Sequence, residues 1–184
     1  MKRVIFLSVI VLNLLLSSCA STYREVSPNT QNYLSSSEDQ GVLLEYKYDV
    51  IKKKKYYKKE LKKGVKVVSV KITNNTSGDL IFGKDIKLVN SHDVDLLLTS
   101  NNEMYDVLKQ KSGLYFLYLL LGFVSFTTFD SEGNVDNSIP VGLVIGPGVA
   151  LGNFFVANSA NKKFKTELTE YELYGKTIKY PGKH

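Results

Sequence analysis

The sequence predicts a mainly β fold, an antiparallel sandwich, joined to a hydrophobic helical hairpin and preceded by an N-terminal signal helix. Three observations support this prediction. Short segments between residues 41 and 99 alternate polar with apolar side chains and are separated by turn residues. Two long uncharged stretches, 112–129 and 137–161, enclose a short acidic loop. A basic start and an apolar run precede the single cysteine.

The length of the chain suits one domain with a hydrophobic core. The chain has 184 residues, a net charge of +6 and one cysteine, so no internal disulfide can form and burial must stabilise the fold. We expect residues 41–111 and 162–184 to form the sandwich, with residues 112–161 as the hairpin.

The first 18 residues have the organisation of an export signal. Lys2 and Arg3 precede an apolar segment at residues 4–16, which is shorter than the roughly 20 residues of a transmembrane helix. Small residues stand directly before Cys19. The motif Leu16-Ser17-Ser18-Cys19 resembles the lipobox of bacterial lipoproteins.

This resemblance implies a covalent lipid anchor. It implies that residues 1–18 are removed, that Cys19 carries diacylglycerol through a thioether, and that an acyl chain such as palmitate is added to the new N-terminus. Two or three acyl chains make a stable anchor. Because Ala20 rather than aspartate follows the cysteine, the expected location is the outer membrane, facing the periplasm. The alternative is an ordinary signal peptide with an incidental cysteine.

Residues 19–40 are expected to form a flexible tether between the lipid and the folded part. Serine, threonine, asparagine and proline prevail there, and the few apolar residues show no period.

The following segment predicts short antiparallel strands. Residues 44–50 alternate apolar with charged side chains, which is typical of a half-buried strand, and residues 66–74 repeat the pattern. Shorter strands are expected at 80–83, 85–89 and 94–99. The strand–turn–strand pattern of residues 66–89 resembles the immunoglobulin-like domains of many envelope lipoproteins.

Residues 51–64 contain eight lysines in fourteen positions. One interpretation is an electrostatic contact with anionic lipid headgroups, worth about 1 kcal/mol per lysine near the surface. The other is a solvated hairpin whose lysines protect a sheet edge. Nucleic acid is not an expected partner of an exported lipoprotein. The lysines considered for lipid contact are Lys52, Lys53, Lys54, Lys55, Lys58 and Lys59.

The two uncharged stretches predict the arms of a hairpin. Leucine and aromatic residues favour helix in the first arm, while Pro147 is expected to kink the second. Glycines recur in the second arm at the four-residue spacing that lets helices approach closely in lipid. The expected contacts with membrane or partner are Leu117, Leu120, Gly142, Gly146, Gly148 and Gly152.

The charges around the hairpin limit how it can meet a membrane. Lysines flank its outer ends and the loop carries three carboxylates, so spanning the inner membrane would reverse the positive-inside rule. Four arrangements stay open: a hairpin dipping into the bilayer beside the anchor, one crossing an outer membrane, one packed on the sandwich or a second copy, and one buried as core.

Catalytic chemistry is poorly supplied, and no cofactor or metal is expected. The only histidines are His92, which we expect in a turn, and His184; no nucleophile elbow occurs, and the ligands are too few for zinc. The acidic loop 130–136 places oxygens at alternate positions, as calcium loops do, but lacks their glycine and their final glutamate. It is expected to be a plain polar loop.

The sequence thus predicts a lipid-anchored envelope protein that is not an enzyme and acts as a scaffold or interaction module. Its expected partners are membrane lipid, through the acylated Cys19, and an envelope protein or a second copy, through residues 113–158. The alternative is a small-ligand-binding or enzymatic lipoprotein with a pocket between hairpin and sandwich.

Overall fold

The computed structural model describes residues 19–181, which divide into two compact units. The hairpin unit contains residues 19–22 and 110–161, and the sheet unit contains residues 23–109 and 162–181. The signal peptide expected at residues 1–18 lies outside the described part of the chain.

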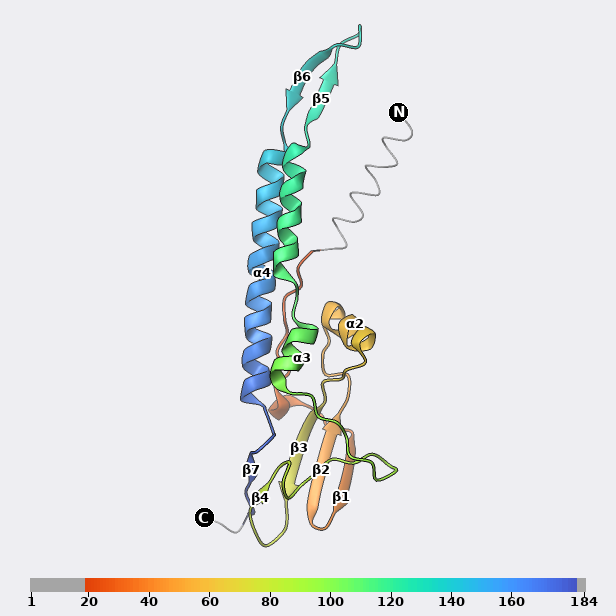
Figure 1. Cartoon of the computed structure of the whole chain (residues 1–184), viewed down its shortest axis with the longest axis vertical. Coiled ribbons are helices and arrows are strands. Elements are labelled where there is room, and N and C mark those ends of the chain that lie inside the picture. Colours follow the sequence, from red (N-terminus) through yellow and green to blue (C-terminus); the bar gives the residue numbers. More distant parts are fainter. Residues whose placement is uncertain (1–18, 182–184) are drawn as a thin grey trace. The chain divides into compact units, whose positions relative to one another are not determined.

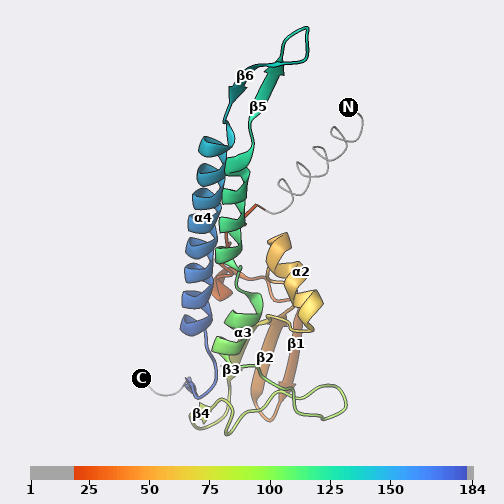
Figure 2. The same ribbon diagram turned by 45° about the horizontal axis from the view of Figure 1, so that its top comes forward.

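An antiparallel sheet of three strands lies in the sheet unit (Figure 2). Its strands are β1 (Ser35–Asp39), β2 (Val42–Lys47) and β3 (Ser69–Asn74), in that order. Gln40 and Gly41 both have positive φ, which is the conformation that two-residue hairpin turns require. The turn therefore fixes the pairing of Asp39 with Val42.

Strand β1 corrects the prediction of a flexible tether. The short 3₁₀ helix η1 (Pro28–Thr30) and β1 both lie within that stretch, and Tyr23 packs in the core of the sheet unit. The pattern was missed because β1 is exposed along its whole length. An exposed edge strand needs only backbone hydrogen bonds, so its sequence carries no apolar alternation.

The lysine-rich segment forms helix α2 (Lys54–Lys63), so the prediction of a solvated hairpin there is wrong. Tyr56 and Glu60 are four residues apart and are the buried positions of this helix. Gly64 ends the helix in the left-handed conformation, with φ of 64°. One helical turn thus carries the two inward residues, and the lysines occupy most of the rest.

Helix α3 (Asn101–Leu108) is a second element that the sequence analysis did not predict. The Ser100 hydroxyl accepts a hydrogen bond from the Glu103 amide at 3.3 Å and caps the helix. The strands expected at 85–89 and 94–99 are absent from the described structure, where only isolated bridges join Phe82 to Ile86 and Val89 to Asp95.

The core of the sheet unit is built largely by helices. Tyr56 comes from α2, Met104 and Leu108 come from α3, and Phe164 comes from α4 (Gly142–Glu170). Val50 and Ile51 complete the cluster. The predicted antiparallel pairing is present, including a short pair between β4 (Leu80–Ile81) and β7 (Thr177–Ile178). The mainly β prediction is wrong, because 38% of the described residues are helical and 21% are in strands or bridges.

The hairpin unit is formed by the two uncharged stretches of the sequence. The 3₁₀ helix η2 (Ser112–Phe123) lies beside residues 142–161 of α4, and the two are joined by a ribbon of β5 (Phe126–Phe129) and β6 (Val135–Ile139) (Figure 1). The helical hairpin therefore has a β tip. Pro147 lies inside α4.

Candidate functional site

The backbone directly after Cys19 is hydrogen-bonded to the hairpin. The Ala20 amide donates to Asn153 Oδ1 at 2.5 Å, and Asn153 Nδ2 in turn donates to the Val149 carbonyl of α4 at 2.8 Å. Ser21 exchanges two hydrogen bonds with the side chain of Gln110, at 3.0 and 2.6 Å. Cys19 itself is exposed. The residue expected to carry the lipid is thus held beside α4.

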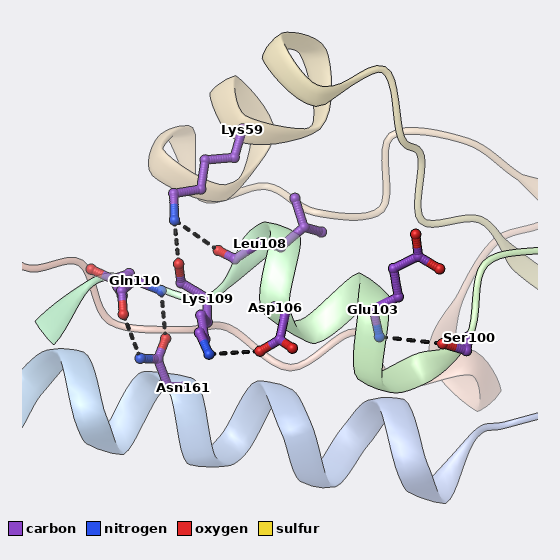
Figure 3. Close-up of polar contacts among 8 residues, drawn as sticks. All are labelled: Lys59, Ser100, Glu103, Asp106, Leu108, Lys109, Gln110 and Asn161. Atoms are coloured by element: carbon purple, nitrogen blue, oxygen red, sulfur yellow. Dashed lines mark hydrogen bonds and ion pairs between the residues drawn. The ribbon is translucent and has the colours of Figure 1, made fainter.

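A buried polar pair closes the base of the hairpin (Figure 3). The backbone amide of Gln110 donates to Asn161 Oδ1 at 2.7 Å, and Asn161 Nδ2 donates to the backbone carbonyl of Gln110 at 2.8 Å. Both side chains are buried. Because Gln110 also bonds Ser21, these two residues tie together the start of η2, the α4 helix and the segment that follows Cys19.

Small residues let η2 and α4 approach closely. Gly142 and Gly146 are buried, and a Cβ at Gly146 would lie 3.0 Å from the Gly122 amide nitrogen and the Tyr118 carbonyl oxygen. A Cβ at Gly142 would collide with the Leu121 carbonyl oxygen. These two glycines therefore serve packing within the hairpin and do not face lipid or a partner.

The faces of η2 and α4 that do not contact each other expose large apolar side chains. Leu117 and Leu120 are 63% and 64% exposed, and Gly148 and Gly152 face open space. The other exposed apolar side chains of the two helical arms are Leu114, Phe116, Leu119, Phe123, Leu143, Val144, Ile145, Leu151, Phe155 and Val156. Helix α4 is long and apolar enough to cross a membrane, and only 22% of its most apolar 18-residue window is buried.

The acidic tip of the ribbon is a turn organised by Asp130. Its Oδ1 accepts hydrogen bonds from the Glu132 amide at 2.9 Å and the Asn134 amide at 2.8 Å. These bonds occupy the carboxylate with its own backbone, as the polar-loop interpretation predicts. Among the described residues, no group of three or more acidic, histidine or cysteine side chains could hold a metal ion.

The lysines of the α2 region take two different roles. Lys59 Nζ donates to the Leu108 carbonyl at 3.2 Å and also to the Lys109 carbonyl, so it ties α2 to the end of α3 (Figure 3). Lys53 and Lys55 are half-buried. The exposed lysines are Lys52, Lys54, Lys58, Lys62 and Lys63. The sequence does not predict lipid contact for Lys62 and Lys63.

Two carboxylates, those of the buried Glu60 and the half-buried Glu167, flank an aromatic cluster in the sheet unit. Glu60 accepts a hydrogen bond from the Val67 amide at 2.8 Å, and Glu167 accepts one from the Val26 amide at 2.6 Å. The second oxygen of each carboxylate is buried without a hydrogen-bond partner. Burial raises the pKa of both carboxyls. It also raises the pKa of Tyr23, whose hydroxyl is hydrogen-bonded to Glu167.

These two carboxylates accept hydrogen bonds from backbone amides and line neither of two surface recesses. One recess, of about 540 Å³, is lined by residues of α4 alone and is an open helix face. A second, about 310 Å³, lies on the loops around Phe82 and Leu97. His92 lies in an exposed turn, as expected.

No family model, curated protein or solved structure matches this chain. The site is therefore defined by its own geometry, which combines an exposed Cys19, a polar clamp and an apolar hairpin. The sequence analysis singled out Cys19 and the hairpin but missed Gln110, Asn153 and Asn161. For Asn153 and Asn161 the signal is an amide side chain in an uncharged stretch, because such a residue needs a partner when buried. Gln110, between Lys109 and Lys111, carries no such signal.

Proposed function

We propose that this chain is a lipid-anchored protein of the cell envelope that works without catalysis, as a membrane-tethered scaffold or interaction module. Its hairpin lies in the same bilayer as the acyl chains on Cys19. The observation that carries the proposal is the hydrogen bond from the Ala20 amide to Asn153, because it holds the lipid-bearing residue against the apolar helix.

The apolar surface of the hairpin supports the membrane location. Fully burying one leucine or phenylalanine side chain is worth roughly 2 kcal/mol, so the exposed side chains of η2 and α4 favour lipid over water strongly. A monomeric soluble protein rarely leaves a contiguous apolar surface of this kind open. The acyl chains on Cys19 would place these apolar side chains next to a bilayer, so lipid is the apolar surroundings nearest to them.

The dimensions favour a hairpin that crosses the bilayer. From Asn153 back to Gly142, α4 rises roughly 16 Å at about 1.5 Å per residue. The ribbon from Val124 to Asp130 adds about 20 Å. The sum slightly exceeds the hydrocarbon thickness of about 30 Å. The acidic turn then reaches the far headgroups instead of stopping in hydrocarbon, where its carboxylates would be costly.

The ribbon gives the module its interaction role. A lone two-stranded ribbon in hydrocarbon leaves the outer backbone groups of β5 and β6 unpaired, which lipid does not tolerate. Pairing with the ribbon of a second copy would satisfy one edge of each ribbon, and a closed ring of ribbons from several copies would satisfy both. The proposal therefore includes self-association through the tip of the hairpin.

The lipid anchor is tested by the mass of the mature N-terminal peptide. The proposal requires acyl groups on a peptide that begins at Cys19, and Cys19→Ser should take up no labelled acyl chain and remain an uncleaved precursor. An unacylated wild-type peptide that begins elsewhere would make this an ordinary secreted protein.

The crossing is tested by labelling with a membrane-impermeant maleimide. Because acylation consumes Cys19, Glu132→Cys provides a single free thiol at the tip, and Ser91→Cys provides the matched exposed control in the sheet unit. With an anchor in the periplasmic leaflet of the outer membrane, intact cells should label only Glu132→Cys. Labelling of that variant only after permeabilisation would show that the hairpin does not cross.

A further inference from the structure

We infer that the exposed face of α2 binds the anionic phospholipid headgroups of the membrane that holds the lipid of Cys19. This inference rests on the lipid anchor proposed above and adds a second, electrostatic contact to it. The headgroup site consists of Lys54, Lys58 and Lys62, with Tyr57 and Leu61 between them.

The geometry of the helix separates these lysines from the core. Tyr56 and Glu60 are buried on one side of α2. At about 100° per residue, Lys54 and Lys58 lie roughly 200° from Tyr56, and Lys62 lies as far from Glu60. The three lysines therefore form one stripe, a turn apart, on the side that faces water, and all three are exposed.

The charge of this stripe is not compensated within the described part of the chain. The ion pairs there use other lysines, such as Lys66 with Asp49 and Lys71 with Glu45. The only carboxylate on α2, Glu60, is buried on the opposite side. The stripe thus presents three positive charges to whatever lies in front of it.

Two side chains on the same face suit a lipid–water interface. Tyr57 is 37% exposed and Leu61 is 62% exposed, although both lie among lysines in a strongly polar helix. Aromatic and leucine side chains lie at the boundary between headgroups and acyl chains, while lysines reach outward to phosphate groups.

The chain itself holds α2 close to the anchor. Tyr23 packs edge-on against Tyr56 of α2, with ring centroids 5.3 Å apart. Cys19 precedes Tyr23 by four residues, which span at most about 14 Å when fully extended. A lipid on Cys19 therefore keeps α2 near the membrane surface, where anionic headgroups are the abundant polyanion. This proximity favours lipid over nucleic acid as the ligand.

The test uses the full acylated protein added to preformed vesicles. Leu61→Cys provides a single free thiol on the α2 stripe, and its rate of reaction with a membrane-impermeant maleimide is compared in two kinds of vesicle. One contains phosphatidylcholine alone, and the other also contains phosphatidylglycerol. The N-terminal peptide mass is measured first, so that a failure of acylation is detected separately.

The labelling rate should fall about tenfold or more in the anionic vesicles and recover in high salt, since each lysine near such a surface contributes roughly fivefold to binding. Replacing Lys54, Lys58 and Lys62 with glutamine should abolish the protection. The same replacement at Lys84, Lys87 and Lys179, which are also exposed, should preserve it. An acylated protein that labels equally fast in both vesicles overturns the inference and leaves the lipid anchor standing. Protection that survives loss of the α2 lysines overturns it too.

Discussion

Two glutamates of the sheet unit each have a carboxylate oxygen that makes no hydrogen bond. Glu60 and Glu167 each satisfy one oxygen with a backbone amide and leave the other buried without a partner. Burial opposes the charged form of each and raises its pKa. The folded chain therefore binds these protons more tightly than the unfolded chain does. Its free energy of unfolding falls as the pH rises through the raised pKa values.

Glu60→Gln should stabilise the protein above that pH range. The amide retains an oxygen for the Val67 amide but carries no charge, so the variant should gain on the order of 1 kcal/mol at about pH 8. At about pH 4, below the ordinary pKa of a glutamate, the gain should shrink, because a carboxyl with a raised pKa is protonated there. Denaturant unfolding at the two pH values measures both. Glu38→Gln, at an exposed position of β1, is the control and should change neither.

Asn161 holds the buried amide pair that closes the hairpin. In Asn161→Ala the backbone amide and the backbone carbonyl of the buried Gln110 would lose their hydrogen-bond partners. The expected loss of stability is roughly 2–5 kcal/mol, and denaturant unfolding in detergent measures it. Asn102→Ala, at an exposed position of α3, should cost less than about 1 kcal/mol. Equal effects of the two changes would contradict the structural role of the pair.

At the scale of elements, the glycines of α4 differ although their spacing is the same. Gly142→Ala places a Cβ against the Leu121 carbonyl and should separate η2 from α4, with a loss of about 1–3 kcal/mol. Gly152→Ala meets no atom and should be neutral or gain up to about 1 kcal/mol in helix propensity. Resistance of the hairpin to protease in detergent measures both. Similar behaviour of the two variants would contradict the packing.

Helices α2 and α3 had readable signals in the sequence that the strand pattern obscured. Ser100 with Glu103 three residues later is a capping pair, and Gly64 follows a segment in which Tyr56 and Glu60 stand four apart. The eight lysines favour a solvated hairpin when only their charge is considered, but an amphipathic helix needs no more than a narrow buried stripe. Its two inward residues were enough to fold it against the core.

Other features could not be predicted because they depend on distant partners. The pairing of Gln110 with Asn161 joins residues 51 positions apart. Tyr23 contacts Tyr56 and Phe164, which are also distant from it in the sequence. The apolar hairpin was predictable, since 18 uncharged residues and then 25 more need cover. Which glycines pack inward was not, because period alone does not distinguish Gly142 from Gly152.

At the scale of the whole molecule, the proposal gives the chain two independent attachments to the bilayer, a covalent lipid and the hairpin. Removing the lipid alone should therefore not release the protein. A chain with Ser in place of Cys19, exported by an ordinary cleavable signal peptide so that no uncleaved segment anchors it, should remain in the membrane fraction after alkaline carbonate extraction. The exposed apolar side chains of η2 and α4 supply the retention.

Adding charges to the hairpin of that unlipidated chain should release it. Leu117→Glu, Leu120→Glu and Leu143→Glu lie at exposed positions, so they disturb little packing but place three carboxylates in hydrocarbon, at roughly 2–3 kcal/mol each. Three glutamates at Ser91, Ser36 and Leu97, exposed positions of the sheet unit, are the control and should leave the protein in the membrane fraction. The same three hairpin changes in the acylated protein should not release it, because the acyl chains remain. Release of the unlipidated chain before any hairpin change would show that the hairpin stays out of the bilayer.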